Sequence, residues 1–296
     1  MISKAATFKQ SIKKGALIMP GAFNAISAML IEKCGFKAVY MSGAGISNSA
    51  GLPDTGILTR DEFVRQAGYI ANAVNIPVIA DVDTGFGGSS EVKKTVEAFE
   101  KIGVAGIQIE DQKPAAKRCG HVSGKEIISA KAMAEKIEAA YDARKNKDFL
   151  IIARTDARSV KGLDHAIKRT KIYRDAGADV IFPEALETKG EFKEFARRVN
   201  ALRCFNAERS EQSIGAPLMA NMTEFGKTPY ITVKEFEAMG YAIVLFPMTA
   251  FRIGMKAMED ALSELKNKGT QKGLLKKMQT RQELYKLIKY EPEKCI

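Results

Sequence analysis

The chain has 296 residues, 46% of them hydrophobic, and its 46 Lys and Arg against 35 Asp and Glu give a formal net charge of +11. The lysines are spread along the whole chain and no basic run carries interleaved aromatic residues, so we expect steering of anions and no nucleic-acid partner. No apolar stretch has the length of a membrane span, and the polar segment 1–14 does not resemble a signal peptide. We therefore expect a soluble, cytoplasmic protein without a membrane partner.

Short apolar runs alternate along the chain with longer segments that carry apolar residues at helical spacing, which is typical of a parallel sheet covered by helices. Strands are expected, in chain order, at 16–20, 38–42, 78–83, 106–110, 150–155, 180–184, 218–222 and 243–247, with helices such as 89–101 and 129–143 between them. No domain break is evident. The pattern predicts the α/β class: a single (β/α)8 barrel of the TIM type over residues 1–296, with a C-terminal helical extension at about 255–290.

Polar side chains stand where these strands end. They are Asp81, Asp83, Glu110, Asp111, Arg154, Glu184, Asn221 and Thr223, with Arg252 shortly after the last strand. A single Asp or Asn at such a position often caps the following helix, but capping does not require so long a series. Because the carboxyl ends of parallel barrel strands form one rim, where active sites are built, we expect these side chains to meet there.

The third strand ends in two carboxylates, Asp81 and Asp83. Their spacing places both side chains on one side of a strand, and adjacent carboxylates repel each other unless a cation or a proton lies between them. Oxygen ligands without a neighbouring His or Cys suit Mg²⁺ or Mn²⁺ better than zinc. Glu110 and Asp111 are candidates to complete the ligand set or to bind its water.

The segment 117–121, Lys-Arg-Cys-Gly-His, surrounds one cysteine with basic residues. Neighbouring positive charge lowers the pKa of a thiol, so Cys119 is a candidate for proton transfer. Gly120 and Gly124 would let this loop approach or cover a ligand, whereas the alternative interpretation is a solvated basic turn with an incidental cysteine. The four cysteines form no C-x-x-C pair, which argues against a zinc site and against a disulfide framework.

Arg154, Arg252 and Arg281 are candidate carboxylate clamps, because a guanidinium group binds a carboxylate through two hydrogen bonds. Arg281, in the helical tail, would on its own be interpreted as a surface residue. The segment 42–45 after the second strand offers backbone N–H groups to an anion. It lacks the third glycine of a dinucleotide-binding loop, so we exclude NAD.

With these residues, the sequence resembles the 2-methylisocitrate lyase branch of the isocitrate lyase and phosphoenolpyruvate mutase superfamily over nearly the whole chain. The matching motifs are YMSG at 40–43, GLPD at 51–54, DVDTGFG at 81–87, IEDQ at 109–112, KRCGH at 117–121, ARTDA at 153–157, FPEA at 182–185, TEFG at 223–226, AFR at 250–252 and QTR at 279–281. The KRCGH loop is specific to the lyases of the superfamily.

The resemblance implies a helix-swapped barrel in a homotetramer, with Mg²⁺ (or Mn²⁺ in its place) at Asp81 and Asp83, partly through water, and with Asp54 and Glu110 nearby. Matches to the family's substrate contacts are Ser42, Gly43, Ala44, Cys119, Gly120, Arg154, Glu184, Asn221, Thr223, Arg252 and Arg281. Cys119 would be the general acid, with His121 in the same catalytic loop. Tyr40 and Lys117 are both candidates for the base.

The implied activity is cleavage of the tricarboxylate 2-methylisocitrate to pyruvate and succinate, in propionate catabolism. Phe182, Leu245 and Pro247 resemble the residues that accommodate the methyl group. The alternatives are isocitrate lyase activity, an enzyme of the superfamily that acts on a small 2-oxo acid or a phosphonate, and a non-catalytic anion-binding barrel.

Two departures from the family stand out. Ala44 replaces a glycine, and its methyl group could slightly crowd the substrate carboxylate. The segment from about 201 to 214 is interpreted as an insertion before the seventh strand. A loop that enters a strand lies on the face opposite the active site, so we expect this insertion to be harmless to catalysis.

Overall fold

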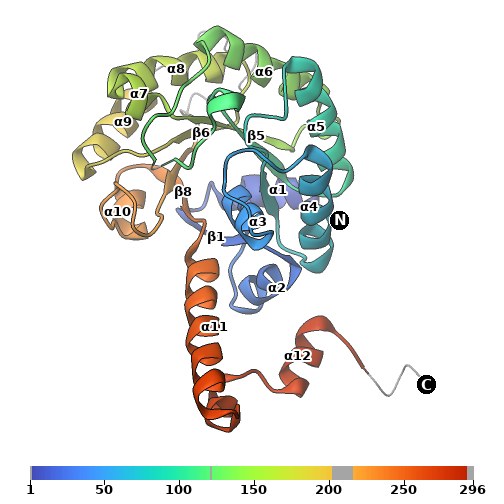
Figure 1. Ribbon diagram of the computed structural model, residues 1–296. Helices are drawn as coiled ribbons and strands as arrows, with labels where there is room; N and C mark the ends of the chain where they lie inside the picture. The colour runs from blue at the N-terminus through green and yellow to red at the C-terminus, as the bar shows by residue number, and fades with distance from the viewer. Residues whose placement is uncertain (1, 121, 202–215, 292–296) are drawn as a thin grey trace.

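The computed structural model describes residues 2–120, 122–201 and 216–291, in which eight parallel strands close into a barrel (Figure 1). The strands are β1 (Leu17–Ala22), β2 (Val39–Met41), β3 (Val78–Asp81), β4 (Gly106–Glu110), β5 (Leu150–Thr155), β6 (Val180–Pro183), β7 (Leu218–Asn221) and β8 (Tyr241–Phe246). Each strand pairs with its neighbour in sequence, and β8 pairs with β1. The expected (β/α)8 fold is confirmed, and the strand boundaries differ from the expected ones by up to two residues.

Helices follow the strands and cover the outside of the barrel (Figure 1). They are α2 (Ala25–Lys33), α3 (Gly43–Ser49), α4 (Arg60–Ala73), α5 (Ser89–Lys101), α6 (Ala130–Ala143), α7 (Ala157–Lys161), α8 (Leu163–Asp175), α9 (Lys189–Ala201) and α10 (Val233–Ala238), with a short 3₁₀ turn η1 (Pro114–Ala116). The sequence sets their limits locally. In α4, for example, Thr59 and Glu62 form a capping box. In α5, Val92, Val96 and Phe99 form the buried stripe that faces the strands.

The core has two layers. One lies between the strands and the outer helices, and the other fills the barrel interior with residues such as Met19, Ile79 and Ile152. The first helix, α1 (Lys4–Ser11), belongs to the interior layer, because its Phe8 is fully buried among residues at the start of the strands, including Leu150 and Val180. Thus α1 closes the end of the barrel opposite the rim, a role that the sequence did not predict.

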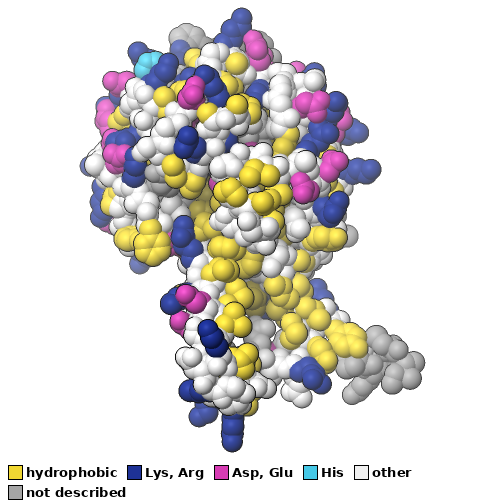
Figure 2. Space-filling view, viewed as in Figure 1, with side chains coloured by type: hydrophobic (Ala, Val, Ile, Leu, Met, Phe, Trp, Pro, Cys, Tyr) yellow, Lys and Arg dark blue, Asp and Glu magenta, His cyan; other side chains and the backbone are white. Residues whose placement is uncertain are grey.

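A C-terminal extension leaves the barrel after β8 (Figure 1). It consists of α11 (Thr249–Lys268), the 3₁₀ segment η3 (Lys272–Lys277) and α12 (Arg281–Ile288), and α12 packs against α2. Figure 2 shows hydrophobic side chains gathered along this extension. They include Met258, Leu262 and Leu265 on α11, which are 53%, 64% and 42% exposed. Within the described part of the chain, no helix is long and apolar enough to cross a membrane.

Candidate active site at the carboxyl rim of the barrel

The rim gathers most of the polar strand-end residues into one buried cluster. Its members are Tyr40, Ser42, Asp81, Asp83, Glu110, Arg154, Glu184, Asn221 and Thr223, each 9% exposed or less. The parallel register explains the proximity: Glu110 pairs with Arg154 across β4 and β5, and Arg154 pairs with Phe182 across β5 and β6. Because alternate strand residues face the interior, these side chains share one compartment.

Asp81 and Asp83 both lie beside Gly43. A methyl group built on Gly43 would approach Asp81 Oδ2 to 2.8 Å and Asp83 Oδ1 to 3.3 Å, and the Gly43 N–H donates to Asp81 Oδ2 at 3.2 Å. The reason for their proximity differs from the expected strand alternation. The strand ends at Asp81, and Asp83 lies in a turn with a left-handed φ of 50°, held by its own N–H donating to Asp81 Oδ1 at 3.1 Å.

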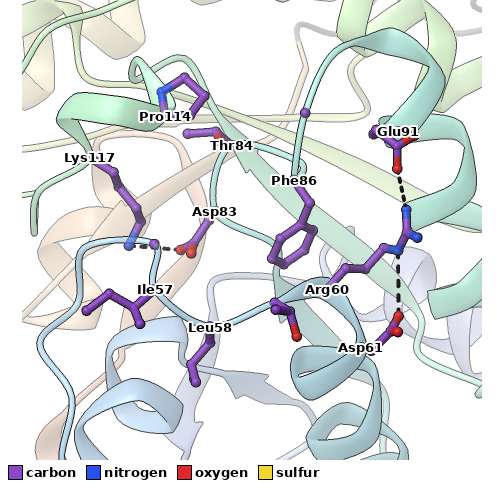
Figure 3. Close-up of a pocket in the computed structure, with 13 residues that line it drawn as sticks. Ile57, Leu58, Arg60, Asp61, Asp83, Thr84, Phe86, Glu91, Pro114 and Lys117 are labelled. Atoms are coloured by element: carbon purple, nitrogen blue, oxygen red, sulfur yellow. Dashed lines mark hydrogen bonds and ion pairs between the residues drawn. The ribbon is translucent and has the colours of Figure 1, made fainter.

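The negative charges of Asp81 and Asp83 are unfavourable because both side chains are buried. Burial raises the pKa of both, although Lys117 opposes this effect. The Lys117 ammonium lies 2.9 Å from Asp83 Oδ1 (Figure 3). It also donates to Asp54. Burial disfavours this ammonium, but Asp83, Glu110 and Asp54 outweigh burial and raise the pKa of Lys117. Lys117 is therefore a cation in this arrangement.

Arg154 is surrounded by three acidic side chains. Its Nε lies 3.0 Å from Asp156 Oδ2 and 3.3 Å from Glu110 Oε2, and its Nη1 lies 3.9 Å from Glu184 Oε2. Asn221 Nδ2 in turn donates to both oxygens of Glu184, at 3.1 and 3.2 Å. These contacts fix the guanidinium group, which lies 5.5 Å from the centre of the Phe182 ring. Arg154 is therefore held in a fixed position within the cluster.

The residues present fit a magnesium ion. Among the side chains that the structure describes, no three of the types His, Cys, Asp and Glu form a metal cage. Mg²⁺ does not need one, because it keeps several waters and is bound through one or two carboxylates, which Asp81 and Asp83 supply. Glu110 Oε1 is buried and accepts no hydrogen bond from any described residue. It is thus a free acceptor for the water that such an ion would carry.

A cavity of about 520 Å³ opens beside this pair (Figure 3). Asp83 and Lys117 are among its polar lining residues, whereas Ile57, Leu58 and Phe86 supply apolar walls. Arg60 lines it too, and its guanidinium is held by Glu91 at 2.9 Å. The cavity therefore reaches the side chain of Asp83.

The turn that carries Cys119 lies directly over Glu184. A methyl group built on Gly120 would come within 2.2 Å of Glu184 Oε1. The thiol of Cys119 is not in a disulfide and the residue is exposed. His121 lies outside the described residues, as does nearly all of the segment 201–214 that was interpreted as an insertion.

The other residues predicted for the site lie in different parts of the chain, and one of them lies outside the barrel. Phe182 and Leu245 are buried in the barrel interior and Pro247 is half-buried just after β8, whereas Ala44 is half-buried in α3. Arg252 lies in the first turn of α11, with its Nε 3.6 Å from Glu224 Oε2. The structure does not bring Arg281 to these residues within the chain, because Arg281 is exposed at the start of α12, outside the barrel.

Two site residues were missed by the sequence analysis. Asp156 binds Arg154 with both carboxylate oxygens, and Gln108 Oε1 accepts a 2.5 Å hydrogen bond from Tyr40 Oη. Asp156 could have been found from the sequence, because an acidic residue two positions after the strand-end Arg154 is a candidate partner for it. Gln108 offered only its position two residues before Glu110, which places both on the inner face of β4.

Comparison with known sequences gives a consistent picture. The sequence model of the phosphoenolpyruvate phosphomutase family matches residues 8–266. A 2-methylisocitrate lyase of Aeropyrum pernix is 50% identical over 278 residues, covering 94% of this chain and 84% of the relative. A 2,3-dimethylmalate lyase of Eubacterium barkeri is 44% identical over 279 residues, covering 94% of this chain and 91% of the relative.

Solved structures agree in fold. A crystal structure of 2,3-dimethylmalate lyase superposes with a TM-score of 0.87 at 34% identity, covering 97% of this chain and 92% of that one. Phosphonopyruvate hydrolase in complex with oxalate and Mg²⁺ superposes with a TM-score of 0.85 at 26% identity, covering 99% and 97%.

Proposed function

The chain belongs to the phosphoenolpyruvate mutase and isocitrate lyase superfamily and is a carbon–carbon lyase, and on that premise we propose that it cleaves 2-methylisocitrate to pyruvate and succinate with Mg²⁺, in propionate catabolism. The observation that carries the proposal is the convergence of the Asp81 and Asp83 carboxylates, the Arg154 guanidinium and the Cys119 turn on one rim. Each of these groups answers a separate need of the reaction.

Binding comes first in the proposed reaction. Asp81 and Asp83 would hold the metal, with Glu110 and Asp54 behind them, while Arg154 and Arg252 bind substrate carboxylates. The segment 42–44, Gly120, Glu184, Asn221 and Thr223 would surround the rest of the substrate, and Phe182, Leu245 and Pro247 its methyl group. Bound there, Mg²⁺ would lower the pKa of the substrate hydroxyl and polarise the adjacent carboxylate.

The hydroxyl proton must then leave, and the geometry favours Lys117 over Tyr40 as its acceptor. Burial and Asp81 raise the pKa of Tyr40, so its phenol keeps its proton. Its hydrogen-bond partner Gln108 is an amide and cannot take that proton away. Lys117 is a cation as well, but its ammonium is in contact with Asp54, so it can accept the substrate proton once it has passed one of its own protons to that carboxylate. We therefore expect Lys117→Met to lower kcat far more than Tyr40→Phe.

Bond cleavage leaves the electron pair on the succinate half. Arg154 and Asn221 would stabilise the enediolate-like charge, and the Cys119 thiol would protonate the carbon to complete succinate. Cys119→Ser should therefore lose most turnover while Mg²⁺ and substrate still bind, which isothermal titration of the variant can measure. Turnover at the wild-type level in this variant would remove Cys119 from the mechanism.

Two relatives define the substrate alternatives. One is named for 2-methylisocitrate and the other for 2,3-dimethylmalate, so a tricarboxylate competes with a dicarboxylate that carries two methyl groups. Cleavage next to the hydroxyl-bearing carbon gives pyruvate from both, with succinate from the first and propionate from the second. Isocitrate would give glyoxylate instead. One methyl group distinguishes isocitrate from 2-methylisocitrate, which an apolar pocket discriminates by about 1–3 kcal/mol.

The deciding assay mixes the enzyme with Mg²⁺ and each of these acids separately, and identifies both products by chromatography. Pyruvate with succinate, formed faster than any other product pair, supports the proposal. Pyruvate with propionate as the dominant pair would make the protein a 2,3-dimethylmalate lyase. Glyoxylate without pyruvate would make it an isocitrate lyase and would overturn the role given to Phe182, Leu245 and Pro247.

We also propose that the chain acts as a homotetramer with its C-terminal extension exchanged between subunits. The support is the apolar side chains exposed on α11 and α12, including Leu262 and Ile288, because patches of this kind mark interfaces. Such an exchange would also give Arg281 a route to an active site. Light scattering on the eluting protein tests the proposal, which a monomeric mass would overturn.

A further inference from the structure

The turn that carries Cys119 is held on its N-terminal side by Gln112, a side chain with no part in the proposed reaction. Gln112 is fully buried. Its Nε2 donates to the Arg118 carbonyl at 2.9 Å, and its Oε1 accepts from the Arg118 N–H at 2.9 Å. Both backbone groups of the residue before Cys119 are therefore fixed by one amide.

On the other side of Cys119, Lys125 holds the next residue. The Lys125 ammonium donates to the Gly120 carbonyl and, at 2.6 Å, to Asp156 Oδ1. The side chains of Lys125 and Asp156 are 2% and 0% exposed. A buried ammonium without an anionic partner is costly, so Lys125 stays with Asp156 and the turn stays with Lys125.

Asp156 connects this clamp to the substrate-binding arginine. The Arg154 Nε donates to Asp156 Oδ2 at 3.0 Å, and Nη2 donates to Oδ1 at 3.1 Å. The Asp156 N–H is itself fixed by Asp111 Oδ1 at 2.9 Å. One carboxylate thus binds both the cation that holds the Cys119 turn and the cation proposed to hold the substrate.

We propose that Gln112, Lys125 and Asp156 are positioning residues that fix backbone groups of the residues before and after Cys119 and so keep the thiol in a constant position relative to Arg154. The inference rests on the proposed function, in which Cys119 is the general acid. A thiol that must deliver a proton to one carbon depends on its position, and a misplacement of about 1 Å can cost about 100-fold in rate. The three residues would therefore act on kcat through Cys119.

The test compares Lys125→Met, Lys125→Arg and Gln112→Glu with the control Lys113→Met. Lys113 pairs with Glu126 at 2.6 Å across the same loop, but that pair is 52% and 58% exposed, so its loss should leave kcat unchanged. We expect Lys125→Met to lower kcat about 100-fold with little change in KM, and Lys125→Arg to restore part of it. Asp156→Asn should also raise KM, because it releases Arg154.

A double-mutant cycle with Cys119→Ser separates positioning from a structural role. If Lys125 acts through the thiol, Lys125→Met has little further effect on the residual turnover of Cys119→Ser. An unchanged 100-fold loss in that background, or wild-type kcat in Lys125→Met, would overturn the inference.

Amide hydrogen exchange of the segment 113–125 gives a measurement that does not depend on activity. Faster exchange confined to this segment in Lys125→Met and Gln112→Glu, and absent in Lys113→Met, supports the clamp. Unchanged exchange, or faster exchange throughout the chain, contradicts it. If the wild type cleaves none of the proposed acids, the proposed function fails while this comparison still decides whether the clamp exists.

Discussion

At the scale of single residues, Gly120 shows how closely the Cys119 turn approaches the floor of the site. An added methyl group would lie 2.2 Å from Glu184 Oε1, and Glu184 cannot easily withdraw because it is fully buried and bound by Asn221. We expect Gly120→Ala to displace the turn and lower kcat about 100-fold with the fold intact, as measured by steady-state kinetics and circular dichroism. Wild-type kcat would mean that the two groups do not approach this closely during turnover.

A matched control is Gly68→Ala in α4. The nearest atom to its added methyl group, Ile102 Cγ2, lies 4.0 Å away, so the substitution causes no clash. Alanine loses less backbone freedom than glycine when a helix forms, which should raise the free energy of unfolding by about 0.5–1 kcal/mol without a change in kcat.

The buried pair Asp81 and Asp83 leads to a prediction on metal addition. Burial disfavours both charges, so a bound cation should stabilise the fold, by about 2.7 kcal/mol when Mg²⁺ is at 100 times its Kd. In Asp81→Asn, thermal unfolding should respond little to Mg²⁺. The control Asp164→Asn removes an exposed partner of Arg198 and should keep the full response. An equal response of Asp81→Asn and the wild type would place the metal elsewhere.

The sequence predicted which polar side chains meet at the strand ends, because the rim of a barrel is fixed by its topology. It could not supply the contacts that depend on side-chain direction. Asp83 reaches the site through a turn with a left-handed φ and not by strand alternation. The contact between Lys125 and Asp156, which links the Cys119 turn to Arg154, joins residues 31 positions apart, and no local pattern encodes that contact.

At the scale of elements, β4 and β5 were predicted to the residue, because each ends in a polar side chain, Glu110 or Thr155, that an aspartate follows. The start of β8 was placed two residues late, at 243, because Tyr241 and Ala242 resemble the end of the preceding turn. Helix α1 was missed because only a few of its residues are apolar, and Phe8 has a partner only once the barrel has closed.

The role of α1 can be tested by Phe8→Ala. The ring is fully buried at the end of the barrel opposite the rim, so its loss leaves a cavity and should lower the free energy of unfolding by about 3–5 kcal/mol. The kcat of the folded fraction should not change. Urea denaturation measures the first effect, and Tyr69→Ala, 59% exposed on α4, should stay within about 0.5 kcal/mol of the wild type. A small loss in Phe8→Ala would mean that the barrel closes without α1.

At the scale of the whole molecule, the C-terminal extension is the part that a single chain does not explain. Met258, Leu262 and Leu265 recur at helical spacing along α11, yet all three are exposed. Sequence periodicity predicts that such a stripe is covered in the folded protein, but it does not identify the surface that covers it. For the same reason, Arg281 could be assigned to the active site only by resemblance, since it lies outside the barrel within its own chain.

The exposed stripe predicts the effect of Leu262→Lys on assembly. A charge in the middle of the stripe should break contacts between subunits and lower the mass in light scattering from that of a tetramer, since an ammonium group is costly to bury in an apolar interface. Asn267→Lys is the matched control, because it adds the same charge on the opposite face of α11 and should leave the tetramer intact. Equal masses for both variants and the wild type would show that α11 is not an interface. If turnover falls with assembly in Leu262→Lys alone, the active site depends on the neighbouring subunit, as an exchanged Arg281 would require.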